Sequence, residues 1–344
     1  MSDNTYREIM HQPEAWNDTL AYLEKNPLLY EKAVRGSFDS FLFSGCGTSY
    51  NLSLSAAALW QKITRTPARG IPASELFLFP DLIGVPGKSY LLFGISRSGE
   101  TSETIRAVNF FRDHFSGLTV GITCDEGSSL LSQVSVPVLT SSAHEESMVM
   151  TQSFTTMLLT LVYFAYFRVQ KENYLSELPG IFKTMISEYE SSIRQLGEDL
   201  SFEKFIFLGN GPYYGVAWEG SLKLKEMTAT PTETFHFLEF RHGPKSIVDQ
   251  KTLIIALTSS AAFSLEKDVI REMHDLGATI FHVGRESLNL TSRCLEIKLK
   301  NMTIDDCTAP ILDVSFLQFL GYYRARAKKM NPDEPRNLTK VVKI

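Results

Sequence analysis

The chain contains the same strand–turn–helix pattern twice. Residues 41–50 form an apolar run that ends in a glycine-containing turn before a helical stretch, and residues 205–214 repeat this order. Gly47 corresponds to Gly211, an offset of 164 positions. The same offset aligns two more pairs, Glu75 with Glu239 and Ser96 with Ser260. A repeat of this length predicts two similar domains in tandem.

Each copy continues with further apolar strands that alternate with helices. This alternation is typical of an α/β fold, in which a parallel sheet has helices on both faces. Right-handed crossovers then place the loops that follow the strands on one edge of the sheet, where ligands bind. The expected parts are an N-terminal helical segment 1–35, a first domain 36–170, a helical connector 171–199, a second domain 200–330 and a tail 331–344. The tail carries Leu338, Val341, Val342 and Ile344, so we expect it to be docked.

The turn from Ser96 to Thr101 has the character of an anion site. The apolar run 90–95 leads directly into Ser-Arg-Ser-Gly-Glu-Thr, and a helical pattern follows. A helix N-terminus offers unpaired N–H groups and the positive end of a dipole. The hydroxyls, the glycine and Arg97 make phosphate the expected guest, although the spacing is not that of a P-loop. The alternative is an ordinary capped strand-to-helix turn.

The second copy has diverged at this turn. Residues 260–265 read Ser-Ala-Ala-Phe-Ser-Leu, without the glycine and with fewer hydroxyls. We therefore expect a phosphate site in the first half only.

Proton-transfer candidates lie in the second half. Glu219, Lys223 and Glu226 fall on one face of a predicted helix 216–227, where the alternative is a solvated salt-bridge face. The chain then runs through an aromatic stretch to His242, which precedes Gly-Pro and so sits on a constrained loop. A carboxylate near a histidine and a phosphate site suits proton abstraction beside a carbonyl.

Two other features are open to more than one interpretation. His236 lies among phenylalanines, which favours a packed structural role. The stretch 145–147, Glu-Glu-Ser, could line the pocket or cap the apolar helix that follows.

Composition excludes several classes of protein. The net charge of -5 argues against a nucleic-acid partner. The four cysteines are Cys46, Cys124, Cys294 and Cys307. They lack the spacing of a zinc site and indicate reduced thiols in a cytoplasmic protein. No metal or other cofactor is implied. The polar first residues do not have the pattern of a signal peptide, so none is expected. The apolar window 148–167 carries enough threonines to favour a buried helix over a membrane span.

These motifs, in this order, resemble the sugar isomerase (SIS) domain proteins. The similarity is greatest to the isomerase half of glutamine–fructose-6-phosphate amidotransferase and to its stand-alone relatives. The matching pieces cover nearly the whole chain: 46–51, 96–101, 153–156, 219–226, 242–244 and 335–340.

The resemblance implies two flavodoxin-like SIS domains per chain and a homodimer. It implies that Glu226 is the base that moves a proton between C1 and C2, and that His242 assists ring opening in the neighbouring subunit's site. Lys223 would sit in the pocket and Lys340 would close over the substrate. The residues it assigns to the phosphorylated sugar are Cys46, Gly47, Thr48, Ser49, Ser96, Arg97, Ser98, Thr101, Ser147 and Met148.

The departures from the family pattern bear on the reaction. Arg97 stands where the amidotransferases usually have Gln, Gln152 where they have Lys, and Met148 and Met150 where small residues are usual. Since the matching motifs begin near the start of the sequence, we expect a stand-alone enzyme without a glutaminase domain. The expected function is deamination and isomerisation of glucosamine-6-phosphate. The alternatives are a ketose/aldose isomerase of the tagatose/galactosamine-6-phosphate type, a fructosamine-6-phosphate deglycase, and a non-catalytic phosphosugar-binding regulator.

Overall fold

A computed structural model describes residues 3–299 and 304–342 of the chain. The chain divides into two compact units. The N-terminal unit is Met10–Pro179 with the tail from Thr339 onward, and the C-terminal unit is Gly180–Leu338 with the first residues up to Ile9. Each unit contains one five-stranded sheet.

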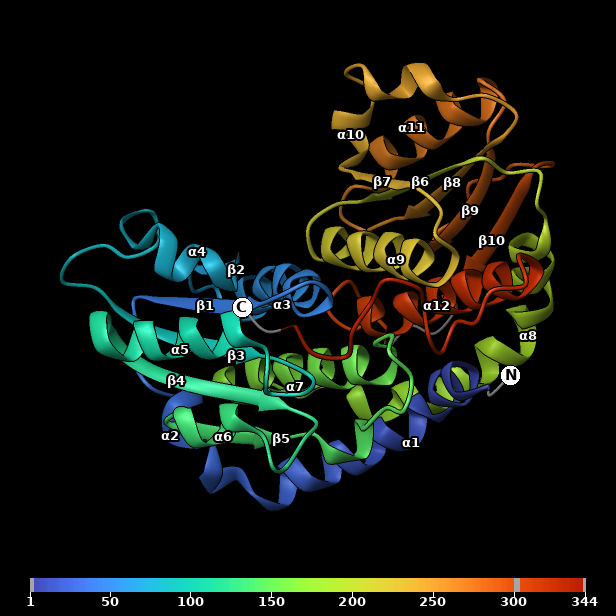
Figure 1. Ribbon diagram of the computed structural model, residues 1–344. Coiled ribbons are helices and arrows are strands. Elements are labelled where there is room, and N and C mark those ends of the chain that lie inside the picture. Colours follow the sequence, from blue (N-terminus) through green and yellow to red (C-terminus); the bar gives the residue numbers. More distant parts are fainter. Residues whose placement is uncertain (1–2, 300–303, 343–344) are drawn as a thin grey trace. The chain divides into compact units, whose positions relative to one another are not determined.

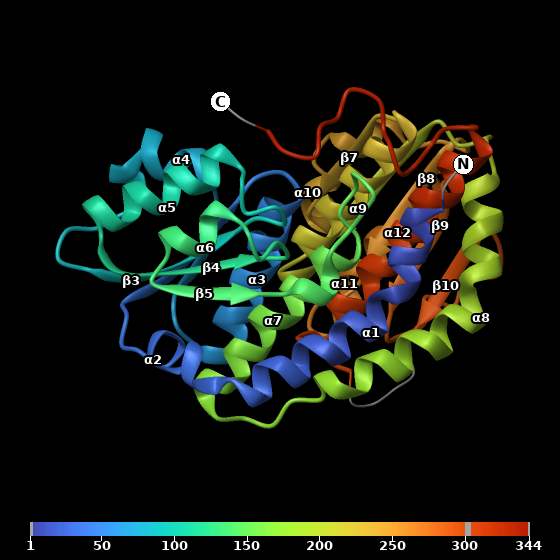
Figure 2. The same ribbon diagram turned by 60° about the horizontal axis from the view of Figure 1, so that its bottom comes forward.

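The N-terminal unit is built on a parallel sheet in the order β2-β1-β3-β4-β5. Its strands are β1 (Ser40–Gly45), β2 (Ala68–Pro72), β3 (Ser89–Ile95), β4 (Ser116–Thr123) and β5 (Val136–Leu139). Helices α3 (Thr48–Thr64) and α7 (Gln152–Val169) pack together, and α4 (Ala73–Leu78), α5 (Ser102–His114) and α6 (Ser129–Gln133) form the other layer (Figure 2). The short helix α2 (Glu31–Val34) contacts α7.

The C-terminal unit repeats this architecture. Its sheet has the order β10-β9-β8-β6-β7 and consists of β6 (Lys204–Gly209), β7 (Thr232–Phe235), β8 (Thr252–Leu257), β9 (Thr279–Gly284) and β10 (Cys294–Lys298). Helices α9 (Pro212–Thr228) and α12 (Ala309–Ala327) cover one face, and α10 (Phe237–Phe240) and α11 (Phe263–Asp275) cover the other (Figure 1). Both sheets have the flavodoxin-like order, so the predicted fold is confirmed. Two long helices cross the boundaries between the units, α1 (Asn4–Lys25) and α8 (Leu178–Glu198).

The repeat is reproduced in backbone detail. Helices α3 and α9 both follow a glycine in an unusual conformation, Gly47 at φ 55°, ψ -123° and Gly211 at φ 54°, ψ -124°. Side chains rarely allow a positive φ of this kind, which explains a glycine at both positions. Both helices also end in a left-handed residue, Arg65 and Ala229.

The alignment of Ser96 with Ser260 is wrong by two residues. Phe41 pairs with Leu91 in the first sheet, and the equivalent Phe205 pairs with Leu253 in the second, an offset of 162. The connection from the second to the third strand is therefore two residues shorter in the second copy. With this register, the residue of the second copy that corresponds to Ser96 is Thr258.

The strands are buried on both faces because helices cover both sides of each sheet. All six residues of β8 are buried, as are all residues of β3 except the first. Helix α7 is buried from Gln152 through Ala165, which agrees with the predicted buried helix. Within the part of the chain that the structure describes, no helix has the length and hydropathy that a membrane crossing requires.

The tail is docked through polar contacts more than through its apolar residues. Asp333 is buried and accepts hydrogen bonds from the backbone N–H and the hydroxyl of Thr5 at 2.8 and 2.7 Å. Leu338 and Val342, which we expected to pack, are exposed. Ile344, also expected to pack, lies outside the described residues.

Helix α12 carries a carboxyl group in an unusual environment. The Asp313 side chain is fully buried, and neither of its oxygens has a hydrogen-bond partner among the described residues. Burial, assisted by the charge of Asp306, raises the pKa of Asp313 well above its ordinary value. The folded protein therefore holds a proton here that the unfolded chain releases near pH 4.

Replacing Asp313 by Asn should stabilise the protein increasingly as the pH rises. The wild type loses stability above the unfolded pKa because only the unfolded state ionises, and Asn has no such loss. We expect the difference in Tm, variant minus wild type, to grow by at least about 2–4 °C between pH 5 and pH 8, the shift that 1 kcal/mol produces in a domain of this size. Asp275→Asn is the control, since Asp275 is 83% exposed in the same unit. A difference in Tm that does not change with pH would contradict this assignment.

Candidate functional site

The turns that follow β1 and β3 meet at the carboxyl edge of the first sheet. These two strands are neighbours, so their ends deliver both turns to one place. The Cys46 Sγ atom lies 3.8 Å from the Thr104 Oγ1 atom, which links the first turn to α5. Thr48 and Ser49 begin α3 and are buried at the same turn. Burial raises the pKa of the Cys46 thiol, so it stays protonated near neutral pH.

The hydroxyls of the Ser96–Thr101 turn are organised among themselves. The Ser96 and Thr101 hydroxyl oxygens lie 3.1 Å apart, and Ser96 Oγ accepts the N–H of Gly99 at 3.1 Å. Ser98 Oγ accepts the N–H of Glu100 at 3.2 Å, and Thr101 is the N-cap of α5. Gly99 has φ 62°, and a Cβ atom there would lie 2.4 Å from Ser128. Only glycine fits this turn.

The segment between β4 and α6 holds the turn from behind. The carbonyl of Arg97 accepts from the Cys124 N–H at 3.0 Å and from the Thr123 hydroxyl at 2.9 Å. The Glu100 carboxylate accepts from both the N–H and the hydroxyl of Ser129. These bonds fix the turn before any ligand binds, which is what a preorganised anion site requires.

The Arg97 side chain contacts the segment Glu145–Val149. Its Nη1 atom donates to Glu145 Oε2 at 3.1 Å. The remaining contacts are to three backbone carbonyls, those of Ser147 (3.3 Å), Met148 (3.0 Å) and Val149 (3.3 Å). Its partners are therefore groups of the protein itself.

Glu145 caps helix α7, as one of the two interpretations of this stretch predicts. Its carboxylate is buried and accepts from the N–H groups and hydroxyls of Thr151 and Ser153 at 2.6–3.1 Å. The Lys340 Nζ atom of the tail donates to the carbonyls of Glu145 at 2.8 Å and Glu146 at 3.3 Å. The Ser147 hydroxyl donates to the Val149 carbonyl at 3.0 Å. The N-terminal unit thus brings Lys340, Ser147 and Met148 to the same stretch that Arg97 contacts.

The charged residues of α9 form a buried cluster, so a solvated salt-bridge face is ruled out. The Lys223 side chain is 1% exposed, with its Nζ atom 2.5 Å from Glu226 Oε2 and 3.3 Å from Glu219 Oε1. Burial by itself lowers the pKa of Lys223, but the two carboxylates outweigh it and leave the pKa raised. Glu226 differs from Glu219 in being 18% exposed, so it is the carboxylate of the cluster that an outside molecule can reach.

His242 lies on the opposite face of the same sheet from Glu226. It follows α10, and its exposed loop is held by Arg241 and Lys245, which pair with Glu272 of α11 at 2.8 and 2.5 Å. Helices α10 and α11 cover one face of the sheet and α9 covers the other (Figure 1). The helices that carry or precede the two residues therefore lie on different faces of the sheet. His236, by contrast, stacks on Tyr214 at 3.8 Å, in line with the predicted structural role.

The equivalent turn of the second sheet is occupied by carboxylates of the chain itself. The N–H of Ser259 donates to Glu266 at 2.7 Å, and the N–H of Ser260 donates to Asp306 at 3.0 Å. Burial raises the pKa of Glu266, while the hydrogen bonds it accepts oppose that shift. Groups that could bind an external anion are therefore already satisfied in this copy.

Comparisons with known proteins agree with this architecture. The SIS domain is matched over residues 39–166. A crystal structure of glucosamine-6-phosphate deaminase from Thermotoga maritima is 30% identical, with a TM-score of 0.81 and 99% of both chains covered. The chain belongs to the SIS domain family.

Two other relatives are a longer protein and a structure at lower sequence identity. Glutamine–fructose-6-phosphate aminotransferase of Pyrobaculum aerophilum is 31% identical over 98% of this chain, which spans 57% of that protein's length. The crystal structure of tagatose-6-phosphate ketose/aldose isomerase from Escherichia coli has a TM-score of 0.87 at 21% identity, with 97% of each chain covered. At that identity the likeness concerns the fold.

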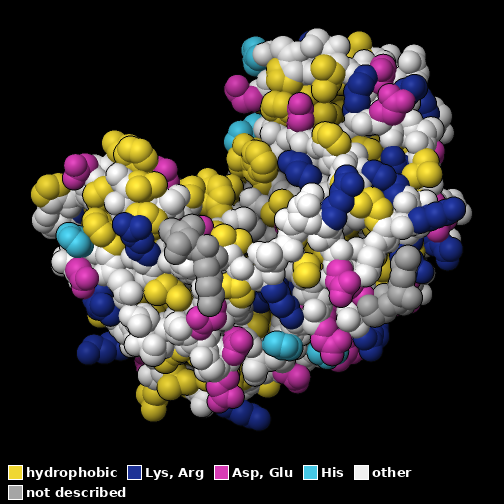
Figure 3. Space-filling view, viewed as in Figure 1, with side chains coloured by type: hydrophobic (Ala, Val, Ile, Leu, Met, Phe, Trp, Pro, Cys, Tyr) yellow, Lys and Arg dark blue, Asp and Glu magenta, His cyan; other side chains and the backbone are white. Residues whose placement is uncertain are grey.

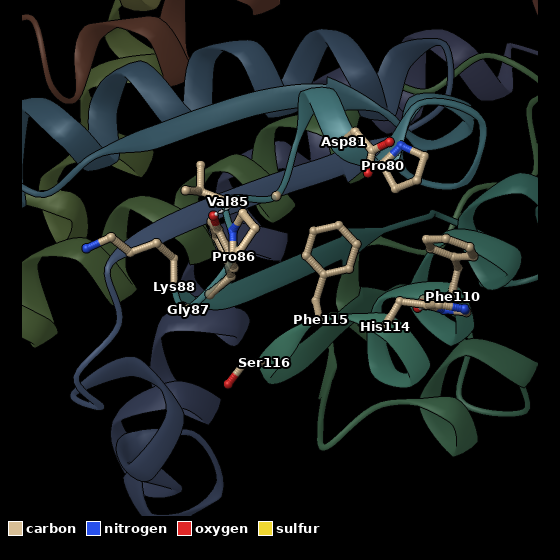
Figure 4. A pocket seen from close by; sticks show the side chains of 12 residues that line it. Pro80, Asp81, Val85, Pro86, Gly87, Lys88, Phe110, His114, Phe115 and Ser116 are labelled. Carbon is tan, nitrogen blue, oxygen red and sulfur yellow. Dashed lines mark hydrogen bonds between the residues drawn. The ribbon is translucent and has the colours of Figure 1, made fainter.

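A pocket of about 490 Å³ lies at the other end of β3, away from the Ser96–Thr101 turn. In Figure 4 the Phe115 ring projects between Val85 and Pro86 on one side and Phe110 and His114 on the other. Exposed apolar side chains continue over α4 and the turn after it, where Figure 3 shows them gathered: Leu78, Phe79, Leu82 and Val85. In SIS-type sheets, ligands bind at the carboxyl ends of the strands, so this pocket is not the candidate site.

The four cysteines are free, as expected. Among the described residues, no cluster of three or more His, Cys, Asp and Glu side chains could hold a metal ion.

The hydrogen bonds that support the site from residues far apart in the sequence could not be predicted. The bonds from Arg97 to residues 145–149 and from Glu100 to Ser129 join segments whose pairing has no local sequence signal.

Lys223→Met should destabilise this SIS protein by about 3–5 kcal/mol, because it removes the cation that faces the fully buried Glu219. Adding Glu219→Gln should recover much of that loss, since the uncompensated charge is then gone. The loss in Lys223→Met and its recovery in the double variant are both read from the free energy of unfolding in urea. Lys225→Met is the matched control, since Lys225 is exposed on the same helix. If Lys223→Met is no less stable than Lys225→Met, the buried cluster is not held by charge.

Proposed function

We propose that this SIS protein converts glucosamine-6-phosphate to fructose-6-phosphate and ammonia. The observation that carries the proposal is the environment of Glu226, a partly exposed carboxylate held 2.5 Å from a buried lysine. A base in such a setting is fixed in place yet open to a carbon acid. The full-length similarity to a structure named as glucosamine-6-phosphate deaminase supports the choice of substrate. The chain spans 56–58% of the aminotransferase relatives, so their complete reaction is not assigned to it.

The Ser96–Thr101 turn binds the phosphate in this proposal. Ser96, Ser98 and Thr101 supply hydroxyls, and the start of α5 supplies N–H groups and a favourable dipole. Ser49 contributes from the neighbouring turn, with Cys46, Gly47 and Thr48 beside the sugar chain.

The reaction then needs one proton shift and one hydrolysis. His242 assists opening of the sugar ring, which exposes the C1 aldehyde. Glu226 takes the proton from C2, giving an enolamine, and returns it to C1, which leaves an imine at C2. Water adds to the imine and ammonia leaves, so fructose-6-phosphate is the product. Lys223 keeps Glu226 oriented, and Lys340 in the tail closes over the substrate.

We also propose a homodimer in which His242 completes the site of the partner chain. The sheet that separates His242 from Glu226 within one chain supports this arrangement. The loop of His242 is both exposed and clamped by two ion pairs to Glu272, which suits a residue presented to another subunit.

The test is product analysis over a panel of sugars, with Glu226→Gln beside the wild type. Wild type should release ammonia from glucosamine-6-phosphate and not from glucosamine. Glu226→Gln keeps the size but removes the base, so kcat should fall by about 10²–10⁴ while KM changes little. In deuterated water the wild type should place deuterium at C1 of the product, because the proton held by the partly exposed Glu226 exchanges with solvent before it returns to carbon.

Other outcomes distinguish the alternatives. Interconversion of an aldose and a ketose phosphate without ammonia would indicate an isomerase. Hydrolysis of a fructosamine-6-phosphate to glucose-6-phosphate and the free amine would indicate a deglycase. Binding without turnover of any sugar would indicate a regulator. Near wild-type turnover by Glu226→Gln would place the base elsewhere.

Mixed dimers test the shared site. Subunits with His242→Ala and subunits with Glu226→Gln should each be inactive alone. A purified hybrid of one of each, isolated through two affinity tags, has one site with both substitutions and one with neither. It should therefore regain about half of the wild-type activity per dimer. An inactive hybrid would show that the two residues do not meet across subunits.

A further inference from the structure

Two cations converge on one short stretch of backbone beside the anion-binding turn. Lys340 donates to the carbonyls of Glu145 and Glu146, and Arg97 donates to those of Ser147, Met148 and Val149. Five consecutive carbonyls thus accept hydrogen bonds from two side chains. One of these comes from the turn itself and the other from the far end of the chain.

We propose that Arg97 is a positioning residue that sets where the tail lysine Lys340 lies. This inference rests on the proposed function, since it gives Arg97 a part in the reaction without contact to the sugar.

The argument begins with the stretch Glu145–Val149, which forms no helix or strand. Apart from the Ser147 hydroxyl, which donates to the Val149 carbonyl, the hydrogen bonds described at its carbonyls come from Arg97 and Lys340. Arg97 fixes three of them with a planar, forked group that can serve several acceptors at once. Glu145 fixes the beginning, because its carboxylate is bound both to Arg97 and to the start of α7. The two carbonyls that hold Lys340 lie at that end.

The electrostatics distinguish this role from phosphate binding. The Arg97 guanidinium is 11% exposed and pairs with Glu145, whose side chain is fully buried, so the pair adds little net charge to the turn. Lys340 is exposed, and its docking rests on the two carbonyls. Loss of Arg97 should therefore disturb the lysine more than the affinity of the turn for an anion.

The variant Arg97→Gln should still fold. The buried Glu145 carboxylate keeps the N–H groups and hydroxyls of Thr151 and Ser153, so its charge remains solvated by hydrogen bonds. Arg97→Lys provides a second variant that keeps the charge but not the fork. Arg112→Gln is the matched control, because Arg112 is a 52% exposed arginine of the same unit that pairs only with its neighbour Asp113 among the ion pairs described.

The first measurement needs no substrate. Trypsin cuts after lysine only when the backbone around it can detach, so docking protects Lys340. Cleavage after Lys340, followed by mass spectrometry, should be severalfold faster in Arg97→Gln than in the wild type. It should be intermediate in Arg97→Lys and unchanged in Arg112→Gln. Equal cleavage in Arg97→Gln and wild type would overturn the proposal.

The second measurement is a double-mutant cycle on glucosamine-6-phosphate turnover. Arg97→Gln should lower kcat with less than about a threefold change in KM. If Arg97 acts through Lys340, the double variant with Lys340→Gln should be no slower than the slower single variant, within about twofold. Additive losses, or a rise in KM at constant kcat, would overturn it and make Arg97 an independent contact of the substrate. A wild type without turnover would defeat the proposed function alone, because the cleavage assay still decides the role of Arg97.

Discussion

Both halves of the chain depend on the parallel pairing of the first and third strands of their sheets. This pairing brings the turn after β1 beside the turn after β3, and the same holds for β6 and β8. Because the strands run in one direction, their carboxyl ends and the starts of the following helices share an edge. Everything that the N-terminal unit contributes to the candidate site is attached to that edge: the glycine turn of α3, the hydroxyl turn of α5, the stretch Glu145–Val149 and the docked Lys340.

The two copies show how one geometry can be kept for binding or closed off. In the second copy, Glu266 and Asp306 accept the N–H groups of the turn after β8, so the chain's own carboxylates stand where an anion would. In the first copy the one carboxylate of the turn, Glu100, faces away toward Ser129, which leaves the hydroxyls directed at one another. A carboxylate that belongs to the chain loses no translational or rotational freedom when it accepts these hydrogen bonds. An external phosphate does lose that freedom when it binds. At the carboxyl edge of the second sheet, these carboxylates therefore have a structural role.

The sequence was sufficient for the fold class, the repeat and the choice of residues, and insufficient for their surroundings. Glycines at equivalent positions predicted the two helix starts because a positive φ leaves little other choice. The alignment of Ser96 with Ser260 was wrong because the connection before β8 is two residues shorter than the one before β3, and nothing in the local sequence reveals this difference. The spacing of Glu219, Lys223 and Glu226 predicted a shared face correctly, but not that Glu219 and Lys223 are buried. The direction of the Arg97 side chain depends on a segment about fifty residues away, which no pattern in the turn reveals.

The placement of the charged residues of α9 and of His242 has a further physical consequence. Helix α9 carries a lysine that is almost fully buried between two carboxylates, an arrangement that costs desolvation energy and seldom adds stability. A chain that needed only stability would be served as well by apolar residues there. What the cluster does provide is a carboxylate whose position is fixed, whose counter-ion is shielded from salt, and whose remaining surface faces outward. His242 lies on the other face of the sheet, on a loop in which Arg241 and Lys245 pair with Glu272. If both groups serve one reaction, as proposed, their placement on different faces of the sheet fits a site to which a second chain contributes.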